Sequence, residues 1–122
     1  MQDKTVDIVI MDDDADICLL MKNVLKFAGY TVQTCSTPDS LTKTVAEVHT
    51  KLIIMDMLLA GFDGREICAS LKKRPLTSNI KIMMMSAHPD GEKSCLLAGA
   101  DLFVEKPFDI DTLIAKVNQI LK

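Results

Sequence analysis

Short apolar runs alternate with amphipathic segments along most of this chain. The first run covers residues 6–11, and behind it apolar side chains recur every three or four positions as far as Leu25. That spacing is the 3.6-residue period of a helix with one buried face. Gly29 follows at the position where a left-handed glycine commonly closes a helix. The pattern predicts a strand followed by a helix.

Four more strand-and-helix pairs follow in the same way. We predict the remaining strands at residues 31–35, 52–55, 80–85 and 102–104. We predict the remaining helices from Pro38, with Thr37 as its N-cap, to about His49, over 66–73, over 89–98, and from the residue after Asp109, which caps it, to the end of the chain. Strands that alternate with helical segments are typical of βαβ units and a parallel sheet. A loop that contains Gly61 and Gly64 precedes the third helix.

Five such units in 122 residues predict a single α/β domain that spans residues 1–122. We expect a doubly wound (βα)5 fold, in which helices cover both faces of an open, five-stranded parallel sheet. A closed barrel of eight units would need about 250 residues, so it is excluded. In an open sheet of this kind, ligands bind at the carboxyl ends of the strands. Functional residues should therefore directly follow the apolar runs.

Composition excludes several classes of protein. The chain is 48% hydrophobic and 25% charged, which is ordinary for a globular domain. A net charge of -3 argues against direct binding to nucleic acid. No apolar stretch reaches the roughly 18 residues that a membrane span requires, and the polar start is not a signal peptide. The four cysteines form no C-x-x-C pair, so we expect buried thiols and no zinc site. These features predict a cytoplasmic protein that does not contact a membrane.

Candidate functional residues stand at the carboxyl ends of four of the five predicted strands. They are Asp12, Asp13 and Asp14 after the first strand, Asp56 after the third, Ser86 after the fourth and Lys106 after the fifth. Because parallel strands end at one edge of the sheet, these side chains should converge there. Carboxylates that share a site repel one another unless a cation is present. Hard oxygen ligands of this kind suit Mg²⁺.

The same group of residues suits phosphoryl transfer. A carboxylate such as that of Asp56 can act as a nucleophile and form an acyl phosphate. Mg²⁺ and the ammonium of Lys106 could neutralise the phosphoryl group as it is transferred. Asp14 and Asp16 are equally well explained as helix caps.

In this combination and order, the motifs resemble the receiver domains of two-component response regulators. The resemblance covers residues 6–121. It rests on Asp12-Asp13, on Asp56 with the turn at residues 61–64, on Ser86-Ala87, and on Lys106-Pro107-Phe108. The family implies a CheY-like, flavodoxin-like sheet with strand order 2-1-3-4-5. It also implies a cis peptide bond between Lys106 and Pro107.

The resemblance implies a role for each residue of the site. Asp56 is the implied phosphoacceptor, Lys106 the partner of a phosphoryl oxygen, Ser86 the switch hydroxyl and Phe103 the switch aromatic residue. The implied Mg²⁺ ligands are Asp12, Asp13, Asp56 and the backbone carbonyl of Leu58. The implied phosphodonor is the phosphohistidine of a sensor histidine kinase or of a histidine phosphotransfer protein.

Such a protein signals in a phosphorelay and is not an enzyme with a separate substrate. It catalyses only its own phosphorylation and dephosphorylation. The family implies that phosphorylation changes the face formed by the helix at 89–98, the strand at 102–104 and the last helix, and so controls an output domain or a target protein. Only Asp101 and Lys116 approximate the pattern of family members that dimerise through this face. We therefore expect a monomer or a weak dimer.

The sequence can be compared with four other classes of protein. A flavin domain would need small hydroxyl and glycine residues after the first strand, where Asp12-Asp13-Asp14 would repel a phosphate. A dinucleotide-binding domain is excluded because no G-x-G-x-x-G follows any strand. A haloacid-dehalogenase phosphatase would place its nucleophile after the first strand within D-x-D-x-T/V, a motif that residues 12–16 do not complete. A receiver-like module that binds partners without being phosphorylated is the remaining alternative. Titration with Mg²⁺ and a phosphodonor assay separate it from a phosphorylated receiver.

Overall fold

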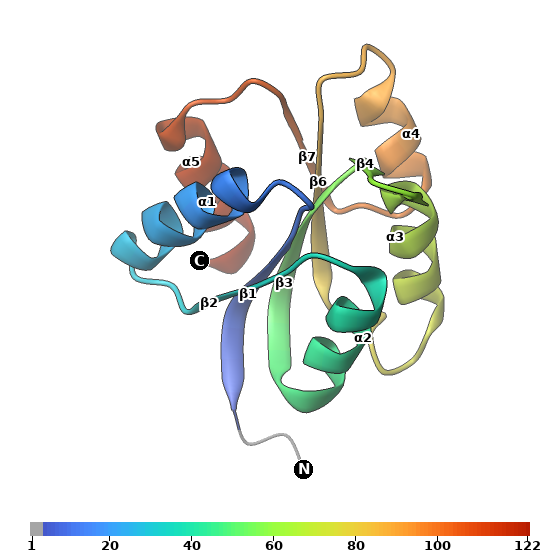
Figure 1. Ribbon diagram of the computed structural model, residues 1–122, viewed down its shortest axis with the longest axis horizontal. Coiled ribbons are helices and arrows are strands. Elements are labelled where there is room, and N and C mark those ends of the chain that lie inside the picture. Colours follow the sequence, from blue (N-terminus) through green and yellow to red (C-terminus); the bar gives the residue numbers. More distant parts are fainter. Residues whose placement is uncertain (1–3) are drawn as a thin grey trace.

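The computed structural model describes residues 4–122, and it contains the predicted parallel sheet. The five parallel strands are β1 (Thr5–Met11), β2 (Val32–Cys35), β3 (His49–Asp56), β6 (Lys81–Ser86) and β7 (Leu102–Glu105). Their order across the sheet is β2-β1-β3-β6-β7, which is the predicted order 2-1-3-4-5 (Figure 1). The helices are α1 (Ala15–Phe27), α2 (Pro38–Glu47), α3 (Gly64–Lys73), α4 (Gly91–Leu97) and α5 (Ile110–Leu121). The predicted fold class is confirmed.

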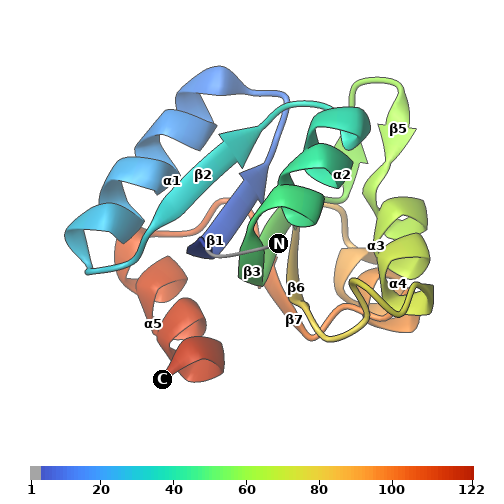
Figure 2. The ribbon, with the colours of Figure 1, turned by 90° about the horizontal axis from the view of Figure 1, so that it is seen from below.

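Helices cover both faces of the sheet. Helices α1 and α5 lie on one face, and α2, α3 and α4 lie on the other (Figures 1 and 2). Alternate side chains of the central strands enter the two resulting cores. Ile8 and Ile54 belong to the core beneath α1 and α5, whereas Val9 and Ile53 belong to the core beneath the other three helices. This two-sided burial explains why the central strands read as continuous apolar runs.

Polar side chains fix the start of four helices. Asp14, Thr37, Asp63 and Asp109 occupy the N-cap positions of α1, α2, α3 and α5, and each side chain accepts a hydrogen bond from a backbone amide of the first turn. A cap of this kind contributes about 1 kcal/mol. The predicted caps at Thr37 and Asp109 are confirmed. Gly29 has the predicted left-handed conformation, with φ of 105° just beyond α1.

Several element boundaries differ from the sequence predictions, and one hairpin was not predicted. Helix α2 ends at Glu47, because His49 already pairs with Thr5 in the β1–β3 ladder. Helix α4 begins at Gly91 instead of residue 89, because the Gly91 amide closes a turn onto the carbonyl of His88. The loop after β3 contains a short antiparallel hairpin of β4 (Leu58–Leu59) and β5 (Phe62–Asp63), which the sequence pattern did not predict.

The cysteines, the helices and one peptide bond can be compared with the sequence predictions. All four cysteines are buried free thiols, as predicted. Within residues 4–122, no helix has the length and apolar character that a bilayer crossing demands. The Lys106–Pro107 peptide bond is cis, as the family resemblance implied.

Candidate functional site

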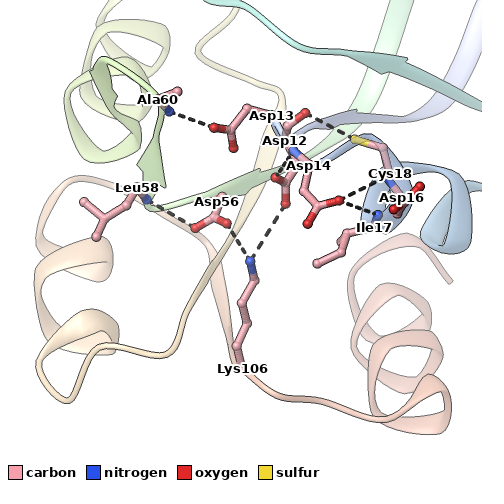
Figure 3. Close-up of polar contacts among 10 residues, drawn as sticks. All are labelled: Asp12, Asp13, Asp14, Asp16, Ile17, Cys18, Asp56, Leu58, Ala60 and Lys106. Carbon is pink, nitrogen blue, oxygen red and sulfur yellow. Dashed lines mark hydrogen bonds and ion pairs between the residues drawn. The ribbon is translucent and has the colours of Figure 1, made fainter.

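Asp56 and Lys106 meet at the carboxyl edge of the sheet. Asp56 is the last residue of β3, and Lys106 directly follows β7. The Nζ atom of Lys106 lies 2.5 Å from Oδ2 of Asp56 (Figure 3). The other carboxylate oxygen, Oδ1, accepts a 3.2 Å hydrogen bond from the amide of Leu58. The Asp56 side chain is 15% exposed, so it is partly shielded but still accessible to a reactant.

Asp12 provides a second carboxylate to the same ammonium group. Its Oδ1 accepts a 2.9 Å hydrogen bond from the amide of Asp14, and its Oδ2 lies 3.8 Å from Nζ of Lys106. The side chain is only 2% exposed, and Oδ2 has no hydrogen-bond partner. Burial raises the pKa of the Asp12 carboxyl above its ordinary value, and the Asp56 and Asp13 carboxylates raise it further, although the Asp14 amide and Lys106 oppose this shift.

The remaining aspartates after β1 point elsewhere. Oδ2 of Asp13 accepts a 2.9 Å hydrogen bond from the amide of Ala60, so this side chain faces the β4–β5 hairpin (Figure 3). Oδ1 of Asp14 caps α1 through the amides of Asp16 and Ile17. Asp12, Asp56 and Lys106 therefore form the centre of the site, and Asp13 lies at its rim. Asp14 has the alternative role of helix cap that its sequence position also allowed.

The site has features that suit a divalent cation. Oδ2 of Asp12 is a buried carboxylate oxygen without a hydrogen-bond donor, which is costly unless a cation or a proton satisfies it. Mg²⁺ is usually held by one or two carboxylates together with water, so Asp12 and Asp56 suffice as the core of a site. No three carboxylate, thiol or imidazole side chains between residues 4 and 122 are already arranged to surround a metal.

Ser86 and Phe103 lie beside this centre, on β6 and β7. The Ser86 side chain is buried, and its Oγ accepts a 2.9 Å hydrogen bond from the amide of His88. The Ser86 carbonyl accepts a 2.9 Å hydrogen bond from the amide of Lys106, which joins the ends of the two strands. Phe103 is 7% exposed, so its ring is directed into the protein.

Gly64 is a part of the site that the strand-end pattern did not reveal. A Cβ atom at this position would lie 2.2 Å from the backbone carbonyl oxygen of Asp56. The Gly64 amide also donates a 2.7 Å hydrogen bond to the carbonyl of Met57. The start of α3 thus lies directly against the backbone that holds Asp56. The sequence signal was limited to a glycine in the loop, because the contact depends on how the hairpin returns to the sheet.

Comparison with known proteins identifies the family of this chain and several relatives. The family model of the response regulator receiver domain matches residues 8–118. The phosphate regulon transcriptional regulatory protein PhoB of Rhizobium meliloti (strain 1021) is 33% identical over 119 residues, which cover 94% of this chain and 52% of PhoB. The chain therefore spans about half the length of this relative.

Solved structures show the same fold. The receiver domain of NtrX from Brucella abortus superposes with a TM-score of 0.86 and is 29% identical, with 94% of this chain and 98% of that chain covered. The chemotaxis response regulator CheY4 of Vibrio cholerae superposes with a TM-score of 0.86 at 21% identity, covering 97% of this chain and 100% of that chain. At that identity, CheY4 supports the similarity of fold alone.

Proposed function

Because this chain belongs to the response regulator receiver domain family, we propose that it is a phosphorylatable receiver of a two-component phosphorelay and that Asp56 is its phosphoacceptor. The phosphodonor is the phosphohistidine of a sensor histidine kinase or of a histidine phosphotransfer protein. Residues 1–122 form one receiver domain in this proposal. The protein acts as a signalling component and catalyses only its own phosphorylation and dephosphorylation.

In the proposed reaction, a carboxylate oxygen of Asp56 attacks the phosphorus of the phosphohistidine. A P–O bond forms, the P–N bond breaks, and the electron pair of the broken bond returns to the imidazole nitrogen. The product is an acyl phosphate on Asp56. The ammonium of Lys106, now 2.5 Å from Oδ2 of Asp56, would pair with a phosphoryl oxygen after transfer. Ser86 can donate its hydroxyl hydrogen to the phosphoryl group, since its hydrogen bond from the His88 amide uses only an oxygen lone pair.

We further propose that Mg²⁺ binds beside Asp56. Its ligands would be the carboxylates of Asp12, Asp13 and Asp56 and the backbone carbonyl of Leu58. The bound cation would supply positive charge that offsets the charge of the transferred phosphoryl group. Asp12 contributes most to holding such a cation, because its buried Oδ2 accepts no hydrogen bond. Asp13 lies at the exposed rim and would exchange its contact with the Ala60 amide for the cation.

The observation that carries the proposal is the contact of Lys106 with both Asp56 and Asp12. One ammonium lies 2.5 Å from the accessible carboxylate and 3.8 Å from the buried one. This arrangement combines a nucleophilic oxygen with positive charge where a phosphoryl group would carry negative charge. If Asp56 served only as a helix cap or in a surface ion pair, there would be no need for a second, buried carboxylate beside the same ammonium.

The proposed output passes through the face formed by α4, β7 and α5. Phe103 lies on β7 in this face, and a groove beside it is lined by Glu92, Phe108 and Lys116, among others. Asp101 already accepts hydrogen bonds from Lys72 and from the Ile82 amide of its own chain, which supports the expectation of a monomer or weak dimer. We also propose a cytoplasmic location, because four buried free thiols fit a reducing compartment.

Intact mass measurement tests the proposed phosphorylation. Incubation with acetyl phosphate and Mg²⁺ should add one phosphoryl group that is labile to base, and chelation of Mg²⁺ should prevent the addition. D56N should not acquire it, whereas D14N, which alters an exposed aspartate that caps α1, should behave as wild type. An equal adduct on D56N would place the nucleophile elsewhere. Absence of any adduct on the wild type would favour a receiver-like module that is not phosphorylated.

A further inference from the structure

Gly91, the first residue of α4, lies between Ser86 and Phe103. It is buried, and its φ is not positive, unlike those of Gly29, Gly61 and Gly99. Any amino acid could therefore adopt the backbone conformation of Gly91. The need for a glycine at this position has to come from its surroundings.

The surroundings leave no room for a side chain. A Cβ atom on residue 91 would lie 2.9 Å from Cβ of Ser86, 3.0 Å from its Oγ and 3.2 Å from Cζ of Phe103. Carbon atoms in good van der Waals contact are about 3.5–4.0 Å apart. The Ser86 side chain and the tip of the Phe103 ring thus already occupy the space that a methyl group at residue 91 would need.

Ser86 cannot readily move away from residue 91. Its carbonyl accepts a 2.9 Å hydrogen bond from the Lys106 amide, and its Oγ accepts a 2.9 Å hydrogen bond from the His88 amide. The Gly91 amide in turn donates to the carbonyl of His88 at 3.0 Å, which closes the turn. The Phe103 ring is held by packing alone and can rotate about its side-chain bonds. The tip of the Phe103 ring, at the far end of a flexible side chain, is therefore the neighbour that can most readily move when residue 91 is enlarged.

We propose that Gly91 is a positioning residue that lets the Phe103 ring lie buried against Ser86. The size of the side chain at position 91 then sets the balance between the buried ring and a ring turned outward onto the α4-β7-α5 face. The consequence of this balance for signalling rests on the proposed function, since Ser86 and Phe103 are its switch residues. The packing of the Phe103 ring against Gly91 and Ser86 does not itself depend on phosphorylation.

Substitution G91A tests the proposal, with K93A as a matched change at an exposed position of the same helix. The readout is the solvent accessibility of the Phe103 ring, measured by NMR as line broadening from a soluble gadolinium chelate in protein without phosphodonor. We expect G91A to shift the ratio of buried to outward ring at least about tenfold toward outward, because overpacking displaces side chains. K93A should leave the ratio unchanged. A ring as protected in G91A as in wild type overturns the proposal.

The double variant G91A/F103L keeps the proposal testable if G91A folds poorly. Leucine lacks the ring tip that the added methyl group would meet. We expect G91A to lower the thermal unfolding midpoint less in the F103L background than in the wild-type background. An equal effect of G91A in both backgrounds would show that the methyl group and the ring do not compete for the same space.

Failure of this proposal can be distinguished from failure of the proposed function. Phosphoryl uptake is measured separately, as added mass on wild type and G91A. Normal uptake by both proteins, together with an unmoved ring in G91A, would refute the role of Gly91 and leave the receiver function intact. A ring that moves outward in G91A, with no uptake by wild type, would support the role of Gly91 and refute the receiver function.

Discussion

Lys106 joins the ends of β7 and β3 by placing its Nζ atom 2.5 Å from Oδ2 of Asp56. The same atom lies 3.8 Å from the buried Oδ2 of Asp12. A single ammonium thus compensates two carboxylates that would otherwise repel each other at close range. It also occupies the region in which a divalent cation would contact the same oxygens. Lys106 and a bound metal should therefore compete for these carboxylates.

We predict that K106M binds Mg²⁺ more tightly than wild type. Two unit charges about 4 Å apart interact by about 1 kcal/mol even in bulk water, so loss of the ammonium should improve the dissociation constant about fivefold or more. Isothermal titration calorimetry measures this constant. K51M serves as the control, because Lys51 forms a surface ion pair with Asp7 away from the site. Unchanged or weaker Mg²⁺ binding by K106M would contradict the shared position of the two cations.

The convergence of these side chains at one edge of the sheet was predictable from sequence. The apolar runs of β1, β3 and β6 end at Asp12, Asp56 and Ser86, and parallel strands place their ends at one edge. The contact of Lys106 with Asp56 follows from the same rule applied to β7. In each case the signal is a change from buried apolar positions to a polar residue, which a single sequence displays directly.

The finer arrangement of the site was not predictable in this way. The β4–β5 hairpin has strands of two residues each, too short to show a period, so nothing indicated that Asp13 would bond to the amide of Ala60. The contacts of Gly64 and Gly91 depend on where helices α3 and α4 approach the strand ends. Those approaches are set by tertiary packing, which leaves no local pattern in the sequence.

We predict that D12N is more stable than wild type at neutral pH in the absence of Mg²⁺. Burial raises the folded-state pKa of the Asp12 carboxyl above 3.8, its ordinary value in an unfolded chain. At pH values between the unfolded-state and the folded-state pKa, the folded protein therefore binds more protons than the unfolded chain. The stability of wild type should fall as pH rises through this window. Removal of this buried charge, whose Oδ2 accepts no hydrogen bond, should stabilise D12N by about 1–3 kcal/mol near pH 7.

Urea unfolding between pH 4 and pH 8 measures this effect. The difference between D12N and wild type should grow as pH rises and shrink toward the acidic end. D14N provides the control, because asparagine caps a helix as well as aspartate does and residue 14 is exposed. A constant difference across the whole range would show that the charge of Asp12 is not its cause.

We predict that G64A destabilises the protein strongly and displaces Asp56. The added methyl carbon would lie 2.2 Å from the Asp56 carbonyl oxygen, a backbone atom that cannot move without shifting the end of β3. Overpacking of this severity should lower the free energy of unfolding by roughly 3 kcal/mol. G61A is the comparison, since Gly61 has φ of 78° and an added Cβ would meet no atom within 4 Å, so the cost of G61A is backbone strain alone. Urea denaturation of both variants measures the two costs, and equal costs would argue against the clash with Asp56.

The last prediction separates phosphorylation from the response to it. S86A should still accept a phosphoryl group on Asp56, because the carboxylate that attacks and the lysine that stabilises the product are unchanged. It should lose most of the conformational response on the α4-β7-α5 face, since the Ser86 hydroxyl is the group that would bond to the phosphoryl oxygen. A two-state element shifts only by the free energy that its ligand supplies differently to the two states. One charge-assisted hydrogen bond supplies about 1.5–3 kcal/mol, which corresponds to a roughly tenfold to hundredfold change in population.

Backbone amide NMR with Mg²⁺ and beryllofluoride, a phosphoryl mimic, measures that response at Phe103 and along α4. S94A is the matched control, because it removes a hydroxyl from α4 whose contacts are with the Gly91 carbonyl and Met57 and not with the site. Wild type and S94A should show the same shifts, and S86A should show a small fraction of them. Full shifts in S86A would mean that the response reaches Phe103 through another residue, and the packing of the ring against Gly91 would then be the first route to test.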